Sequence, residues 1–178
     1  MCGRAGVGVG AVQVLEYSGD ELEDVAGEFF LPAIIRTGPA FRGRAAIQGL
    51  GETLTLSRSH SGQMSALGTD RMAARASADN LMIFCIYIGG RCRVRQHDRC
   101  AELAGVRGCS PRSVARFEWA SSAEARRKSL RFSRELLPLR TAEITEACAP
   151  RRPVAPAMQV LAGYLGRLFE VADELTAG

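Results

Sequence analysis

Cysteine and histidine are the residue types of this chain that could act as nucleophiles or bind a metal ion. The 178 residues include two histidines, His60 and His97, and six cysteines. No two cysteines have the CxxC spacing of a zinc site, and neither histidine has a second ligand residue at a usable spacing. We therefore expect no metal site, no other cofactor and free thiols. The cysteines are Cys2, Cys85, Cys92, Cys100, Cys109 and Cys148.

A possible enzymatic nucleophile stands at the amino terminus, in Met1-Cys2-Gly3-Arg4. Once Met1 is removed, the α-amine of Cys2 could act as the base for its own thiol. This start resembles class II amidotransferases and the SRAP domains that crosslink to abasic DNA, and Phe117-Glu118-Trp119 resembles an SRAP turn. Other SRAP motifs are missing. We expect no catalytic residue, and a Cys2 enzyme is the alternative.

The composition is typical of a folded protein rather than a disordered one, with 47% hydrophobic and 24% charged residues. The net charge of +4 comes almost entirely from arginine, since Lys128 is the only lysine. The arginines are scattered, which favours a GC-rich coding sequence over a nucleic-acid surface. No secretory signal is evident, and no apolar run approaches the ~20 residues that a membrane span needs. A cytoplasmic protein without membrane contact is expected.

Hydrophobic periodicity predicts one short helix followed by about seven strands. Ser18-Gly19-Asp20 offers capping groups for a helix through Leu22, Val25 and Phe29, after a loose lead-in over 1–17. Gly89-Gly90 between two strand-like runs predicts a hairpin, and 69–80 is predicted as loop or edge. The strands are expected over 53–57, 64–68, 81–88, 91–96, 101–103, 113–119 and 129–132.

The carboxyl-terminal segment predicts a linker and a long helix. Residues 149–156 are proline-rich and basic, as in a linker, and Ser133 is a plausible helix cap upstream. Apolar residues then recur with a heptad spacing. The pattern fits two structures equally, an amphipathic helix packed on its own domain or the seam of a homodimer. The seam residues are Met158, Leu161, Leu165, Leu168, Ala172 and Leu175.

This order of elements predicts an α+β fold that is mainly β, namely a small antiparallel barrel or jelly roll with helices at both ends. Residues 1–148 would form the lead, the first helix and the barrel. Residues 149–178 would form the linker and the last helix.

The stretch from Phe41 to Leu137 resembles the amino-terminal cupin-like domain of AraC/XylS-family transcriptional regulators. The matching segments occur in the family's order, and the terminal heptad helix matches its dimerisation helix. They are Phe41-Arg42-Gly43-Arg44, the apolar run and glycine pair at 83–90, Val94-Arg95-Gln96, Ala101-Glu102-Leu103 and residues 130–137.

The resemblance implies the effector-sensing and dimerising half of a bacterial transcriptional regulator, not an enzyme. The family's helix-turn-helix domain is absent, so DNA would be contacted only through that missing domain. The partners implied are a second copy of the chain, through the last helix, and an unknown small-molecule effector inside the barrel. A stand-alone dimerisation or antagonist module is a further alternative.

An effector pocket inside such a barrel would be lined by alternate strand residues. The same residues could instead fill the core, and a one-residue slip in register would reverse their facing. The candidates are Arg44, Leu54, Leu56, Arg58, His60, Phe84, Ile86, Cys92, Val94 and Trp119.

Overall fold

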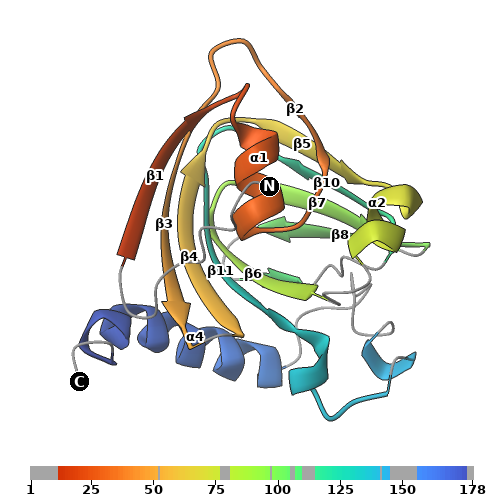
Figure 1. The fold of residues 1–178 in the computed structure, drawn as a ribbon. Coiled ribbons are helices and arrows are strands. Elements are labelled where there is room, and N and C mark those ends of the chain that lie inside the picture. Colours follow the sequence, from red (N-terminus) through yellow and green to blue (C-terminus); the bar gives the residue numbers. More distant parts are fainter. Residues whose placement is uncertain are drawn as a thin grey trace, which may run out of the picture.

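Two antiparallel β-sheets, lying face to face, make up most of the protein (Figure 1). The computed structural model describes residues 12–51, 53–76, 81–96, 98–104, 107–109, 115–140, 142–144 and 156–175. One sheet has six strands in the order β1-β3-β4-β11-β6-β9, and the other has five in the order β2-β5-β10-β7-β8. The predicted fold class, mainly β with antiparallel sheets and few helices, is confirmed.

The strands of each sheet come from widely separated parts of the chain. The six-stranded sheet consists of β1 (Val12–Ser18), β3 (Arg42–Leu50), β4 (Leu54–Ser61), β11 (Ala125–Ser133), β6 (Leu81–Gly89) and β9 (Arg107–Cys109). The five-stranded sheet consists of β2 (Ile34–Thr37), β5 (Met64–Gly68), β10 (Phe117–Ser121), β7 (Arg91–Gln96) and β8 (Arg99–Ala104).

The first helix, α1 (Leu22–Phe29), lies between the two sheets at one end (Figure 1). Leu22, Ala26 and Phe29 are buried because their spacing places them on one side of the helix. The helix was expected, but its cap differs from the predicted one. The side chain of Glu21 accepts hydrogen bonds of 2.9 Å from both the backbone N–H and the hydroxyl of Ser18. This turn therefore fixes the entry of the chain into α1.

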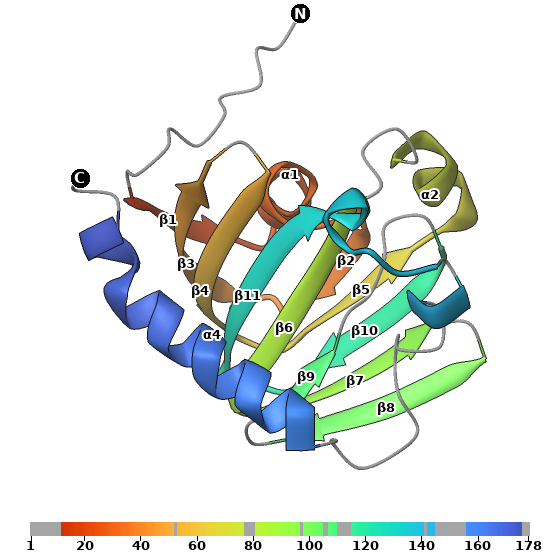
Figure 2. The ribbon, with the colours of Figure 1, turned by 90° about the horizontal axis from the view of Figure 1, so that it is seen from below.

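The last helix, α4 (Pro156–Leu175), runs along the outer face of the six-stranded sheet (Figure 2). Leu165, Phe169 and Ala172 are buried there. Two side chains from the sheet also bond to helix carbonyls. Gln48 donates to the Ala172 carbonyl at 3.1 Å, and Arg58 donates to the Phe169 carbonyl at 2.6 Å. Both faces of this sheet are consequently covered, one by the second sheet and one by α4.

The hairpin predicted at Gly89-Gly90 is wrong. β6 pairs with β11 and β9, whereas β7 pairs with β10 and β8, so the two strands belong to different sheets. Gly90 has a φ of 76°, which favours glycine. The turn thus exists, but it carries the chain from one sheet to the other.

Other elements also differ from the sequence expectation. β1 occupies part of the predicted lead-in, and a helix, α2 (Asp70–Ala76), occupies part of the predicted loop. Ser133 caps a short 3₁₀ helix, η1 (Arg134–Leu136), by accepting a hydrogen bond of 3.3 Å from the Glu135 N–H. The described residues contain eleven strands rather than seven. Of the linker predicted over 149–156, residues 149–155 lie outside the described residues and Pro156 is the first residue of α4.

Candidate ligand-binding cavity

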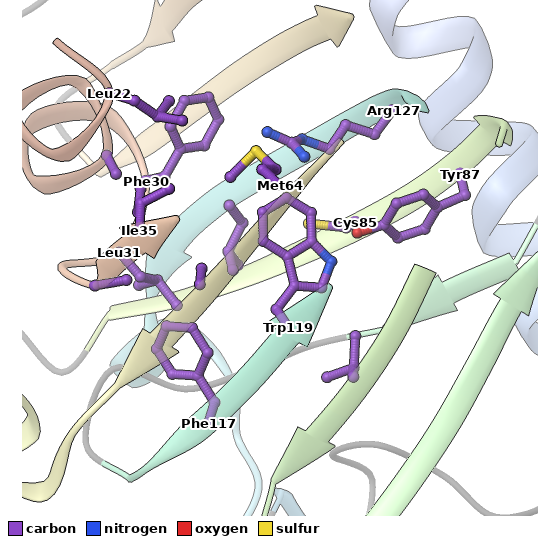
Figure 3. A pocket seen from close by; sticks show the side chains of 15 residues that line it. Leu22, Phe30, Leu31, Ile35, Met64, Cys85, Tyr87, Phe117, Trp119 and Arg127 are labelled. Carbon is purple, nitrogen blue, oxygen red and sulfur yellow. The ribbon is translucent and has the colours of Figure 1, made fainter. Parts of the chain in front are cut away.

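A cavity of about 70 Å³ lies between the two sheets, beneath α1 (Figure 3). The side chains around it come from α1 and its following loop, from the five-stranded sheet, and from β6 and β11 of the six-stranded sheet. They are Leu22, Ala26, Phe30, Leu31, Ala33, Ile35, Met64, Ala66, Ile83, Cys85, Tyr87, Val94, Phe117, Trp119 and Arg127.

The wall contributed by the five-stranded sheet is aliphatic and aromatic. Phe117 and Trp119 alternate with exposed or half-buried residues on β10, so both rings face inward. Gly68 stands opposite Phe117 on β5, and a Cβ at Gly68 would lie 2.1 Å from the Phe117 ring. This glycine therefore leaves the space that the Phe117 ring occupies at the cavity.

Arg127, on β11, is the one buried charged residue in the part of the chain that the structure describes. Only 5% of it is exposed. The register of β11 with β6 shifts between Arg126 and Arg127, and this irregularity places Arg127 opposite Tyr87. Figure 3 shows the guanidinium directed toward Met64 and Trp119. It lies over the Trp119 ring at 4.3 Å and over the Phe30 ring at 5.8 Å.

The two rings compensate this charge only in part. A desolvated cation–π contact contributes about 2 kcal/mol, whereas burying a charge costs several kcal/mol even after relaxation. The Nη1 atom of Arg127 has no hydrogen-bond partner among the described residues, and none of their ion pairs includes Arg127. The guanidinium is therefore an unneutralised cation inside a largely apolar cavity.

Two hydroxyl groups on the six-stranded sheet are also buried near this guanidinium. Ser59 is directly across from Arg127 on β4, and Tyr17 is two residues further along on β1 in the same inner layer. Neither the Ser59 Oγ nor the Tyr17 hydroxyl has a partner within the described ranges. Burial raises the pKa of Tyr17, an effect that the charge of Arg127 partly opposes, so the phenol stays protonated at neutral pH.

Cys92 lies behind Trp119 and is not a reactive thiol. The Trp119 indole N–H donates a hydrogen bond to the Cys92 sulfur. Burial raises the pKa of Cys92 from 9.0 to about 12, against the smaller lowering effect of hydrogen bonds from Tyr87 and Trp119. Because the thiolate is the nucleophilic form, this cysteine has no nucleophilic role at neutral pH.

The structure brings three of the ten sequence-predicted pocket residues to the cavity region and places the other seven elsewhere. Val94 and Trp119 line the cavity, and Cys92 contacts Trp119. The remaining apolar candidates belong to the opposite face of the six-stranded sheet, where they pack beneath α4. They are Leu54, Leu56, Phe84 and Ile86. The alternating sequence pattern predicted correctly that these residues share one face of a sheet. That face packs against the helix α4 and not against a ligand cavity.

The three polar candidates also lie outside the cavity. Arg44 is exposed and faces Glu16 at 3.8 Å. Arg58 reaches α4 through the Phe169 carbonyl, and His60 is exposed with its Nε2 2.7 Å from a Glu124 carboxylate oxygen. None of the three is in position to orient a molecule bound between the sheets.

The heptad residues of α4 pack mainly on their own domain in this chain. Leu165 and Ala172 are buried against the six-stranded sheet, and Leu168 is half-buried there. Leu161, by contrast, is 40% exposed. The side chains of Met158 and Leu175 lie outside the described residues. Of the two interpretations left open by the sequence, packing on the same domain is the one seen for these residues.

Sequence reasoning missed Arg127 because β11 follows a misleading pattern. Leu130 and Phe132 alternate with Arg127, Ser129 and Arg131. Such alternation predicts that the polar side faces solvent. Here α4 covers the apolar side, and the second sheet covers the polar side around Arg127 and Ser129. The inner face of β4 carries Ser57, Ser59 and Ser61 in the same way. Only knowledge of the second sheet would have identified this inner polar surface.

The described residues were also searched for metal ligands, free thiols and membrane-spanning helices. No group of three or more His, Cys, Asp or Glu side chains there could hold a metal ion. Cys85, Cys92 and Cys100 are free thiols. Cys2 and His97 lie outside the described residues, so the alternative of a Cys2 nucleophile stays untested. Within the same ranges, every helix is too short or too polar to span a bilayer.

Comparison with solved structures finds a similar fold that extends over most of this chain. The chain superposes on the AraC-like transcriptional activator CuxR with a TM-score of 0.76 at 14% identity, covering 90% of this chain. It spans 61% of that protein's length. KdgF from Halomonas is more distant, with a TM-score of 0.39 at 12% identity over 57% of this chain and 88% of that one.

A further similarity is to the Schizosaccharomyces pombe Cnp3 cupin domain, with a TM-score of 0.38 at 6% identity over 52% of this chain and 63% of that one. No protein-family profile matches the sequence, and no curated protein matches it. The similarity to CuxR shows a shared fold, which is of the predicted mainly β, antiparallel class.

Proposed function

We propose that this chain is the ligand-binding domain of a bacterial transcriptional regulator and senses a small organic molecule in the cavity between its sheets. The observation that carries this proposal is the cavity itself. Its walls are mostly apolar, with a guanidinium placed at one side, which is typical of small-molecule sites. The shared fold with an AraC-like activator supports the regulator class.

The strands that form the cavity also support α4, which gives a route for the signal. On β4, Ser59 faces the inner layer while Leu56 and Arg58 contact α4. On β11, Arg127 faces the cavity while Leu130 packs toward Phe169 and Leu168. A ligand that displaces these two strands changes the surface on which α4 rests. Occupancy of the cavity would thereby shift the population of α4 positions.

The same proposal includes two partners. DNA would be contacted through a helix-turn-helix domain, and a second copy of the chain would form a homodimer. Because Leu165, Leu168 and Ala172 pack on their own sheet, a homodimer through α4 would use its other side. That side exposes Val160 (73%) and Tyr164 (66%), beside the 40% exposed Leu161.

Two readouts on the whole chain test the sensor proposal. Trp119 is the only tryptophan and lies at the cavity, so its fluorescence reports binding there. Amide hydrogen exchange over 156–175 reports the docking of α4. We expect that some members of a panel of neutral and charged small molecules change the Trp119 emission, and that the same compounds change exchange in α4. Binding without any change in α4 would contradict sensing, and a panel without any binder would contradict a ligand site.

A further inference from the structure

We infer that the ligand of this cavity is a small organic monocarboxylate, held by its carboxylate on Arg127 with its apolar part against the aromatic and aliphatic wall. This inference rests on the proposed ligand-binding function and names the class of molecule that the site takes.

The charge of the cavity is the first argument. Arg127 is 5% exposed, and the fifteen residues around the cavity include no Asp or Glu. A buried cation without a counter-ion is unfavourable, and a bound anion supplies that counter-ion. Since Arg127 is the only charged residue in the lining, a single negative charge balances it, whereas a phosphate group would bring more negative charge than the site neutralises.

The hydrogen-bond donors are the second argument. Arg127 Nη1, the Ser59 hydroxyl and the Tyr17 hydroxyl are all buried, and each lacks a partner among the residues described. All three lie on the inner face of the six-stranded sheet. Ser59, on β4, is next to Arg127 on β11, whereas Tyr17 is on β1, which β3 separates from β4. Of the three residues, only Arg127 lines the cavity itself. A carboxylate accepts through two oxygens and pairs with a guanidinium in a bidentate manner. An amide or alcohol of the same size offers neither the charge nor the second equivalent acceptor.

The space away from the guanidinium determines the size and polarity of the rest of the ligand. Leu31, Ile35 and Phe117 line the cavity away from Arg127. These side chains offer apolar contact and no acidic or basic group. The cavity volume of about 70 Å³ is about half of the roughly 150 Å³ that accommodates benzene, so the cavity suits a short aliphatic chain. A large polar ligand such as a nucleotide has no matching groups on this wall.

Matched pairs of acids and amides test the inference on the wild-type chain. Propanoate and butanoate are titrated against the fluorescence of Trp119, beside propanamide and butanamide, which have nearly the same shape without the charge. We expect each acid to bind at least about 30-fold more tightly than its amide, because losing one partner of a buried charged pair typically costs this much or more. Equal affinities for acid and amide would overturn the inference.

Two arginine variants locate the charge that is responsible. Arg127→Met should lower the affinity for both acids by at least about 30-fold and leave the weak amide binding unchanged. Arg126→Met is the control, since Arg126 is the preceding arginine on the same strand but is exposed. It should bind the acids as wild type does. Full acid binding by Arg127→Met, with circular dichroism showing a folded chain, would overturn the inference.

The outcome also separates this inference from the proposed function. If neutral compounds bind at Trp119 and the acids do not, the carboxylate inference is wrong while the ligand-binding function stands. If neither class binds and the panel of neutral and charged small molecules also contains no binder, both are wrong. The wild-type comparison of acid with amide decides the question even where Arg127→Met fails to fold.

Discussion

Two opposing contributions to the free energy of unfolding come from the buried side chain of Arg127. Its stacking on Trp119 and Phe30 stabilises the folded protein, and the loss of hydration destabilises it. The desolvation term is the larger, because a cation–π contact reaches only about 2 kcal/mol and the penalty for a buried ion is several kcal/mol. In the absence of a ligand, the residue that would serve binding therefore reduces stability.

Replacing this arginine should stabilise the ligand-free chain. For Arg127→Met we expect the free energy of unfolding in urea at neutral pH to rise by roughly 1–3 kcal/mol, since an apolar side chain of similar length fits the cavity without a charge. Arg126→Met should change it by no more than about 0.5 kcal/mol, as is usual at the surface. A loss of stability in Arg127→Met alone would show that the stacking outweighs the desolvation.

The thiol of Cys92 makes stability depend on alkaline pH. Burial raises the pKa of Cys92 from 9.0 to about 12, so above pH 9 the unfolded chain loses this proton while the folded chain keeps it. The unfolded state then binds fewer protons, and the free energy of unfolding falls as pH rises from 9 toward 12. For this one group the slope is at most about 1.4 kcal/mol per pH unit.

The contribution of Cys92 is measured as a difference between two chains. Urea unfolding of wild type and Cys92→Ala is compared at several values of pH from 8 to 11. Cys92→Ala is expected to be less stable at pH 8, because it leaves a small space beside Trp119, but to lose less stability with rising pH. Parallel pH profiles for the two chains would contradict the buried, protonated thiol.

At the scale of elements, α4 is part of the hydrophobic core and not a detachable appendage. Leu165 and Phe169 are 3% and 2% exposed, and they contact different parts of the same sheet face. Burying one such side chain contributes about 1.5–3 kcal/mol. Adjacent positions on the helix differ sharply, since Tyr164 is 66% exposed.

This contrast predicts opposite results for two neighbouring substitutions. Leu165→Asp removes a buried side chain and buries a carboxylate, so we expect it to lower the free energy of unfolding by at least about 3 kcal/mol. Tyr164→Asp should change it by less than about 1 kcal/mol. Both are measured by urea unfolding followed by circular dichroism. Similar losses in the two variants would mean that α4 does not dock on the sheet through Leu165.

Local sequence patterns predicted most helices and strands, but they did not predict which layers pack against each other. The helix at Leu22, the strands through Leu56 and Ile86 and the last helix all follow from periodicity over neighbouring residues. Periodicity cannot say which layer covers a given strand face. For that reason Leu56 and Phe84 were expected at a pocket but lie beneath α4, while Arg127 was not recognised. Val94 and Trp119 do line the cavity, because they lie on strands whose inner face is apolar.

For the whole molecule, the two sheets and α4 form three layers in which the six-stranded sheet is the middle one (Figure 2). Among the side chains of α4 that the structure describes, three exposed ones are large and apolar, namely Val160, Leu161 and Tyr164. A stable interface of standard size buries roughly 1,600 Å² in total, more than three side chains supply. A homodimer through this side alone is therefore expected to be weak and to depend on concentration.

Sedimentation of the whole chain tests this expectation at the level of the assembly. We expect a monomer–dimer equilibrium with a dissociation constant on the order of micromolar, since an interface below the standard size seldom binds more tightly. Tyr164→Asp should shift the equilibrium to monomer without unfolding, because that side chain is exposed. Arg93→Ala, which removes an exposed ion pair of 2.6 Å with Glu102 on the five-stranded sheet, away from α4, serves as the control and should leave the equilibrium unchanged. A wild-type chain that stays monomeric at high concentration would exclude this face as a homodimer interface, and α4 would then act only on its own sheet.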